Sequence, residues 1–202
     1  MKPSDPIAQA IEAELAALAN LEGSVACMYL DDDDPGNVTC GRGHLLPTQA
    51  SALLLPWQID GQPATPAQIA ADYQAVKAAQ PGHVWTRYEP MTVCRLAPAD
   101  QEGLCRNDLI GCAQRLQVHF PQLGQYPVAA IQGALDIEFN CGDFPIARNK
   151  AGALEWPSLT RAVLANDWAA AAVQSHRAPP VSAARNAYVR SLFVQASATP
   201  QA

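Results

Sequence analysis

The sequence lacks a long run of apolar residues and a recognisable secretion signal. A membrane-spanning helix needs about 20 consecutive, mostly apolar residues, and no segment of this 202-residue chain offers them. Residues 1–20 carry Asp5, Glu12 and Glu14 where a signal peptide would have a basic start and an apolar stretch. We therefore expect synthesis in the cytoplasm without a signal peptide, and no insertion into a membrane.

The chain also has few basic residues. Only 16% of the residues are charged, and 13 Lys and Arg against 19 Asp and Glu give a net charge of −6. Because nucleic-acid binding depends on many basic contacts with phosphates, this balance disfavours a nucleic-acid partner. The hydrophobic content of 49% is typical of a folded globular protein rather than of a disordered chain.

Motifs for cofactors and metals are missing as well. No Cys-x-x-Cys pair occurs, and no Lys-Ser or Lys-Thr follows Gly41-Arg42-Gly43 as in a phosphate-binding loop. The acidic run at 31–34 begins like a calcium loop, but Pro35 stands at its fifth position and Arg42 at its twelfth. The twelfth position of such a loop requires a bidentate glutamate. We expect neither a metal nor a cofactor.

The chain has six cysteines. Without zinc-type spacing this number suits disulfides, with six buried thiols as the alternative, and disulfides would indicate a protein that works outside the cytoplasm. Cys27 and Cys40 are equidistant from a turn centred between Asp33 and Asp34, so a two-stranded hairpin would place them opposite each other. The sequence therefore predicts a disulfide between Cys27 and Cys40, with two adjacent buried thiols as the alternative.

The first predicted helix is marked by its start and by its apolar face. Asp5 can cap it, and Pro6 suits its first turn. One apolar stripe at helical spacing is formed by Ile7, Ile11, Leu15 and Leu18. Glu22 continues this stripe before Gly23 ends the helix. A carboxylate in such a position needs a partner or a function, because burial opposes its ionisation.

The remaining pattern predicts a hairpin followed by helices. Residues 25–30 and 37–42 flank the acidic turn as short strands. Thr65 should cap a helix whose inner face is Ile69, Tyr73 and Val76. Further helices are expected at about 100–120, with Gly111 as a candidate break, and at about 127–140, 157–164, 167–175 and 182–196.

These elements predict an α+β fold that is mostly α, formed by a single domain over residues 1–202. A small lobe with the hairpin would cover about 1–65, and a larger helical lobe about 66–196, followed by a tail at 197–202.

Two carboxylates could form the chemical centre of such a fold. Glu22 at a helix end and Asp31 on the hairpin could face each other across a groove, which is the minimum apparatus for hydrolysing a glycosidic bond. The apolar stripe should keep Glu22 protonated as a proton donor, while Asp31 on a polar hairpin stays ionised. The alternative is a plain helix-end residue beside a solvated acidic turn.

The same region resembles the phage-type lysozyme family. The family's signature is Glu-Gly, then Tyr-x-Asp, then Gly-x-x-Thr-x-Gly-x-Gly-His-Leu, which occurs here as Glu22-Gly23, Tyr29-Leu30-Asp31 and the segment 36–45. Residues 134–142, 175–177 and 185–193 resemble later helices of the family, so the resemblance covers nearly the whole chain. The stretch 55–73 looks most like bacterial members linked to interbacterial secretion.

The resemblance implies a lysozyme-like fold and a muramidase that cleaves the β-1,4 bond between N-acetylmuramic acid and N-acetylglucosamine with inversion. Glu22 matches the general acid, Asp31 the carboxylate that orients or activates the attacking water, and Thr39 the hydroxyl that contacts this water. Arg185 matches a buried arginine that pairs with the acid in the family. Tyr29, in the same signature, and His44, a structural residue of the small lobe, are expected to support the site.

The hairpin turn departs from the family's pattern. Asp31 precedes Gly36 by five residues, whereas the family's aspartate usually precedes the glycine by three. Counting back from Gly36 nominates Asp33 instead. We prefer Asp31, because an insertion should extend the tip of the turn while Tyr29 and Asp31 stay on the strand.

The implied substrate, the glycan strands of peptidoglycan, lies in the periplasm or in the cell wall. The protein would reach it after lysis as an endolysin, or after export as an antibacterial effector, which we favour. An effector implies a secretion-machine component and a cognate immunity or inhibitor protein as partners. The alternative function is a non-catalytic peptidoglycan-binding or assembly module with a lysozyme fold. Lytic transglycosylation is a further alternative.

Overall fold

The computed structural model describes residues 5–21, 23–31, 36–81, 84–149 and 151–199. Helices dominate, and a small antiparallel sheet of three strands makes the fold α+β, as expected. In the described ranges, no helix is long and apolar enough to cross a membrane.

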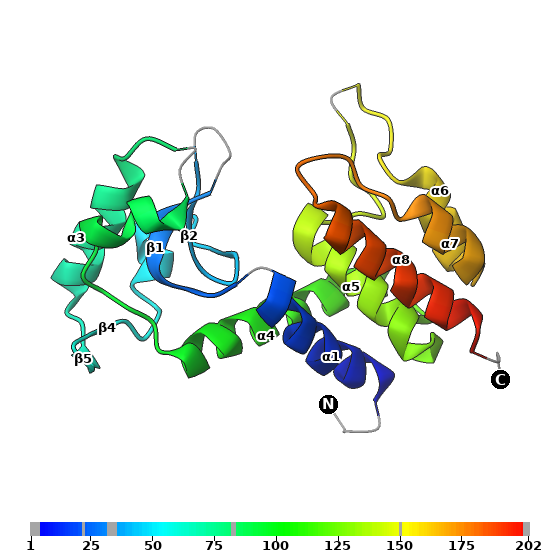
Figure 1. The fold of residues 1–202 in the computed structure, drawn as a ribbon, viewed down its shortest axis with the longest axis horizontal. Coiled ribbons are helices and arrows are strands. Elements are labelled where there is room, and N and C mark those ends of the chain that lie inside the picture. Colours follow the sequence, from blue (N-terminus) through cyan, green and yellow to red (C-terminus); the bar gives the residue numbers. More distant parts are fainter. Residues whose placement is uncertain (1–4, 22, 32–35, 82–83, 150, 200–202) are drawn as a thin grey trace. The chain divides into compact units, whose positions relative to one another are not determined.

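The chain forms two compact units (Figure 1). The first, here called the hairpin unit, is Leu18–Asn107, and the second, the helical unit, combines Met1–Ala17 with Asp108–Ala202. This division differs from the approximate lobe boundary expected near residue 65. Helix α3 (Pro66–Lys77) belongs to the hairpin unit because it packs against the sheet, whereas most of α1 (Pro6–Leu21) belongs to the helical unit.

The sheet of the hairpin unit contains the two predicted strands, β1 (Val25–Leu30) and β2 (Val38–Gly41), and a third, β3 (His44–Leu45), which the sequence did not indicate. Tyr29 lies opposite Thr39. The register then shifts between Val25 and Tyr29, so Cys27 falls in an irregular stretch and the even pairing assumed for Cys27 and Cys40 does not hold. All six cysteines are among the described residues, and no disulfide joins any of them.

Helix α3 packs against the sheet. Thr65 caps it, since its hydroxyl accepts a hydrogen bond from the Gln68 N–H while the Gln68 side chain accepts one from the Thr65 N–H. Its predicted inner face is buried in the core of the unit, and consists of Ile69, Tyr73 and Val76. The short elements around it are α2 (Gln49–Ala52), β4 (Gln58–Ile59), β5 (Gln62–Pro63), η1 (Trp85–Arg87) and η2 (Glu89–Met91).

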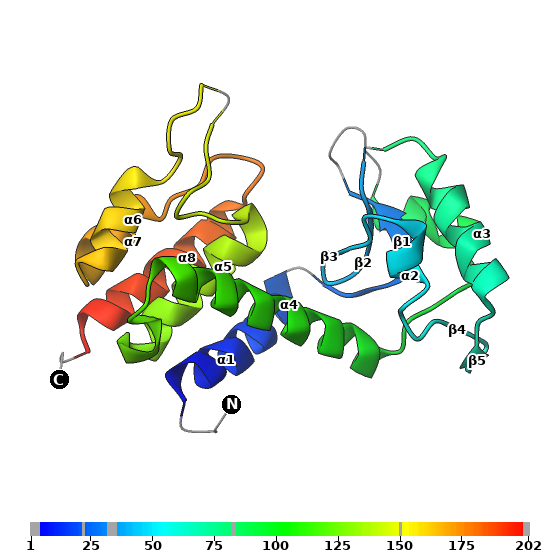
Figure 2. The same cartoon turned by 180° about the vertical axis from the view of Figure 1, so that it is seen from behind.

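The helical unit contains α1 and the later helices. Asp5 caps α1 through a 3.0 Å hydrogen bond from the Ile7 N–H, and the predicted apolar stripe of α1 is buried. The later elements are α4 (Pro98–His119), which belongs to this unit from Asp108 onward, η3 (Leu123–Gln125), α5 (Val128–Cys141), α6 (Pro157–Leu164), α7 (Trp168–Gln174) and α8 (Ala183–Ser197). Figures 1 and 2 show α8 running between α5 and α7, with both of which it packs.

Helix α4 corrects the expected break at Gly111, because it is continuous from Pro98 to His119. One interior glycine costs a helix only about 1 kcal/mol relative to alanine. The neighbouring residues Leu109, Cys112 and Leu116 are all buried, and their packing outweighs that cost.

Candidate active site

The turn end of the hairpin brings Asp31 and Thr39 to one backbone carbonyl group. Asp31 follows β1, and its N–H donates to the Asn37 carbonyl oxygen at 3.1 Å. From β2, the Thr39 hydroxyl donates to the same oxygen at 3.2 Å. The Asn37 N–H in turn donates to Asp31 Oδ1 at 2.7 Å. Asp31 and Thr39, two of the predicted site residues, therefore lie together because both are hydrogen-bonded to the backbone of Asn37.

The two side chains differ in exposure. Thr39 is 4% exposed, whereas Asp31 is half-buried. A carboxylate that remains accessible can meet a water molecule or a substrate, and a buried hydroxyl bonded to the backbone holds its position. This combination suits a carboxylate that acts on a water molecule beside a fixed hydroxyl.

The two supporting residues of the hairpin lie in the same sheet. Tyr29 is half-buried opposite Thr39 and packs against the core of the unit. His44 lies in β3 opposite Cys40 and is also half-buried. Both therefore belong to the sheet that holds Thr39.

Glu22 and Asp33 lie outside the described residues. The residues on either side of Glu22 are described: Leu21 is the last residue of α1, and Gly23 has a φ of +71°. Residues with a side chain rarely adopt this conformation, which explains a glycine there. The helix predicted to carry Glu22 thus ends where the sequence indicated.

Arg185 belongs to a buried ionic cluster in the helical unit. It is 6% exposed, and its Nε donates to both carboxylate oxygens of Asp136 in α5, at 3.0 and 3.2 Å. Arg177 Nη1 lies 2.8 Å from Asp136 Oδ1, and Arg177 is 2% exposed. Among the described residues, Asp136 is thus a carboxylate that binds Arg185, and the sequence analysis assigned no role to it.

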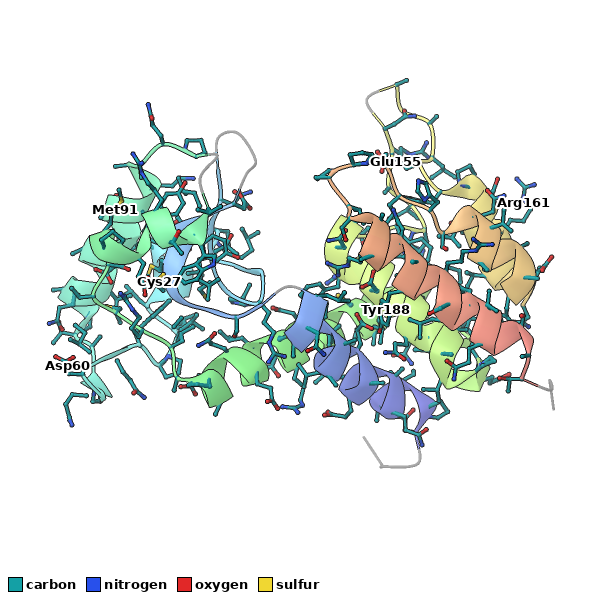
Figure 3. All side chains as sticks on the ribbon, in the orientation of Figure 1. Cys27, Asp60, Met91, Glu155, Arg161 and Tyr188 are labelled. Carbon is teal, nitrogen blue, oxygen red and sulfur yellow. The ribbon has the colours of Figure 1, made fainter. Side chains whose placement is uncertain are left out.

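A second carboxylate of this cluster was also missed. Glu14 of α1 is 0% exposed, and its Oε2 accepts a 2.7 Å hydrogen bond from the Tyr188 hydroxyl of α8. Tyr188 is labelled in Figure 3. The Tyr188 oxygen accepts a 2.7 Å bond from Gln132 Nε2 of α5. One polar chain therefore links three helices inside the unit.

Burial determines the protonation of this cluster. Loss of solvent and the negative charge of Asp136 raise the pKa of Glu14 to about 8, although the hydrogen bond from Tyr188 lowers it. Burial likewise raises the pKa of Asp136, and the charge of Arg177 opposes that rise. Near neutral pH, Glu14 is therefore mostly protonated.

The role of this cluster is to stabilise the fold. A fully buried carboxyl such as Glu14 has no contact with solvent, so it cannot reach a glycosidic bond. Its sequence signal was nevertheless present, because Glu14 lies three residues after Ile11 and four before Leu18, on the same helical face. Asp136 offered a similar signal, since both its neighbours in sequence are apolar.

The thiols show no sign of activation. Burial raises the pKa of Cys27, and it raises the pKa of Cys94 and of Cys112 to about 12. A reactive cysteine requires the opposite shift, because the thiolate is the nucleophile. These three residues are therefore inert at neutral pH.

Among the residues that the structure describes, no group of His, Cys, Asp and Glu side chains could hold a metal ion. The chain matches no protein-family model and no curated protein with which it was compared. Residue chemistry and local geometry therefore carry the assignment of a function.

Proposed function

We propose that this protein is a peptidoglycan hydrolase of the phage-lysozyme type, a muramidase that cleaves the β-1,4 bond between N-acetylmuramic acid and N-acetylglucosamine. The observation that carries this proposal is the convergence of Asp31 and Thr39 on the Asn37 carbonyl group. These are two of the three residues that the lysozyme signature assigns to catalysis, and they meet although seven residues separate them in the sequence.

Asp31 is proposed to act on the attacking water. Its Oδ1 is turned to the Asn37 N–H, so its orientation is defined while its side chain remains accessible. A carboxylate held in this way can accept a proton from water. Thr39 on the neighbouring strand is proposed to contact that water. In an inverting enzyme the water enters from the side opposite the leaving group, and the two carboxyl groups lie about 6.5–9.5 Å apart.

Glu22 is proposed to protonate the leaving oxygen. Its two neighbours in the sequence are Leu21, the last residue of α1, and Gly23, which has a positive φ. The overall α+β architecture, with a hairpin sheet in one unit and a helix bundle in the other, supports a lysozyme-like fold.

The test is hydrolysis of isolated cell walls by the purified chain and by Glu22→Gln. We expect the wild type to release reducing sugar ends and the variant to lose activity by about 100-fold or more, because a general acid typically contributes that much. Glu155→Gln, which changes an exposed carboxylate in the helical unit, is the matched control and should stay active. Equal release by wild type and Glu22→Gln would contradict the proposal.

The same assay separates the alternatives. A non-catalytic peptidoglycan-binding or assembly module would sediment with the walls and release nothing from them. A lytic transglycosylase would leave anhydro ends in place of reducing ends. The proposed site of action is the periplasm or the cell wall, reached after export as an antibacterial effector or after lysis as an endolysin. For an effector, a secretion-machine component and an immunity protein are the proposed partners.

A further inference from the structure

A lysine of the hairpin unit reaches the turn that holds Asp31. Lys77 is the last residue of α3, and its Nζ donates a 2.9 Å hydrogen bond to the Gly36 carbonyl oxygen. It is the only lysine in the sequence of this unit, Leu18–Asn107. The bond joins residues 41 positions apart in the chain, so the folded unit rather than the local sequence brings this charge to the turn.

Lys77 and Asp31 bind the two ends of one peptide group. The Gly36 carbonyl that accepts from Lys77 and the Asn37 N–H that donates to Asp31 Oδ1 belong to the same peptide bond. A peptide group is planar, so fixing the direction of its carbonyl also fixes the direction of its N–H. The two hydrogen bonds, at 2.9 and 2.7 Å, also strengthen each other by polarising the amide between them. The cation therefore holds the N–H towards the carboxylate.

The backbone at Gly36 does not hold this peptide group by itself. Gly36 has a φ of +71°, and glycine adopts positive and negative φ about equally readily. The peptide group that follows it can therefore rotate at a small steric cost. A rotated peptide group would turn its carbonyl oxygen towards the Asp31 carboxylate and remove the N–H from it. An ammonium group bonded to the carbonyl oxygen opposes that rotation.

Helix α3 is itself fixed in the hairpin unit, and it lies beside β1 and β2 (Figures 1 and 2). Asp72 is 5% exposed, and its Oδ2 accepts hydrogen bonds from the N–H groups of Val93 and Cys94 at 2.9 and 2.7 Å. Val76, which precedes Lys77, is 0% exposed in the core of the unit. A side chain can position another group only if its own element is rigid, and α3 meets this condition.

We propose that Lys77 is a positioning residue of the proposed hydrolase. It keeps the peptide group between Gly36 and Asn37 turned so that the Asn37 N–H orients the Asp31 carboxylate towards the attacking water. Lys77 touches neither the sugar nor this water, and it acts through one peptide group. The inference rests on the proposed function, because it takes the role of Asp31 from it.

The first test observes the peptide group by NMR on the full chain labelled with ¹⁵N and requires no hydrolysis. Lys77→Met removes the ammonium group, and we expect the Asn37 amide to exchange with solvent about tenfold faster or more, because its bond to the carboxylate opens more often. Lys77→Arg should restore slow exchange, since a guanidinium group also donates to a carbonyl oxygen. Arg87→Met, which removes an exposed cation of the same unit, is the matched control and should leave the exchange unchanged. Wild-type exchange at Asn37 in Lys77→Met would overturn the proposal.

The second test separates positioning from substrate binding by measuring kcat and KM on soluble glycan strands. We expect Lys77→Met to lower kcat by about tenfold or more with KM within about twofold, because a misdirected carboxylate slows only the chemical step. Lys77→Arg should regain most of kcat, and Arg87→Met should keep the wild-type value. In an Asp31→Asn background Lys77→Met should cause no further loss, since it acts through Asp31. An equal loss in both backgrounds would overturn the proposal.

Failure of this inference is distinguishable from failure of the proposed function. If the wild type releases reducing ends and Lys77→Met matches its kcat, the inference alone is wrong. A loss of kcat in Lys77→Met without faster exchange at Asn37 would also overturn the inference, because Lys77 would then not act through this peptide group. If the wild type releases no reducing ends, the proposed function is wrong, and the inference about its catalysis fails with it.

Discussion

Asp31 shows how the backbone can orient a single side chain. Its carboxylate accepts from the Asn37 N–H at 2.7 Å, and its own N–H donates to the Asn37 carbonyl oxygen at 3.1 Å. An insertion that extends the tip of the turn predicts that Asp31 stays on the strand, and the structure places it directly after β1. The competing residue Asp33 lies outside the described residues, so the choice of Asp31 stays a prediction.

The choice between the two aspartates is tested by separate substitutions. We expect Asp31→Asn to lower the rate of wall hydrolysis by about 100-fold or more, because the amide cannot accept a proton from water. Asp33→Asn should retain most of the activity. Asp60→Asn, at the β4–β5 turn, is the control for loss of one carboxylate in the same unit. Loss of activity in Asp33→Asn alone would assign the role to Asp33.

At the scale of elements, local signals located the long helices well. The helix predicted at 157–164 is α6 (Pro157–Leu164), and the one predicted at 182–196 is α8 (Ala183–Ser197). Their starts carry a proline and a serine cap, which are readable without tertiary information. The short elements β3, β4 and β5 were missed because a two-residue strand exists only through its pairing with another segment.

Helices α5 and α8 pack closely at Gly133, so a side chain added there should destabilise the fold. A Cβ atom added at Gly133 of α5 would lie 3.1 Å from Phe193 Cε2 and 3.2 Å from Phe193 Cζ. We expect Gly133→Ala to lower the free energy of unfolding by about 1–3 kcal/mol, because the packed ring must move. Urea unfolding followed by tryptophan fluorescence measures this change.

Gly111 of α4 provides the matched control in the same unit. A Cβ atom there would meet only the end of the Arg115 side chain, at 3.6 Å. Gly111→Ala should therefore raise the free energy of unfolding by about 0.5–1 kcal/mol, since alanine favours the helix. Destabilisation of both variants by the same amount would show that contact with Phe193 is not the cause.

At the scale of the whole molecule, the buried cluster couples stability to pH. The pKa of Glu14 is about 8 in the folded chain and 4.5 ordinarily, so between these values the folded form binds more protons than the unfolded form. Stability must then fall as pH rises across this range, by up to about 1.4 kcal/mol per pH unit from this group. The groups around it are Asp136 and Gln132 of α5, Tyr188 and Arg185 of α8, and Arg177.

Glu14→Gln tests this coupling. The amide preserves the shape of the side chain and an oxygen for the Tyr188 hydroxyl, but it does not ionise. We expect unfolding free energies measured in urea at a series of pH values to fall less steeply between pH 4.5 and pH 8 in this variant. The variant should also be more stable than the wild type at alkaline pH. Glu155→Gln should keep the wild-type slope, and an identical slope in Glu14→Gln would contradict the prediction.

The sequence by itself determined the class of fold, the order of the main helices, the hairpin and the pairing of Thr39 with the Tyr29 strand. These features follow from capping residues, periodicity and turn composition, which act over a few neighbouring residues. The tertiary structure alone decided that α3 joins the hairpin unit, that α4 continues through Gly111 and that Asp136 holds Arg185. Each of these depends on which distant surfaces are buried together, and burial is a property of the folded chain rather than of any local segment.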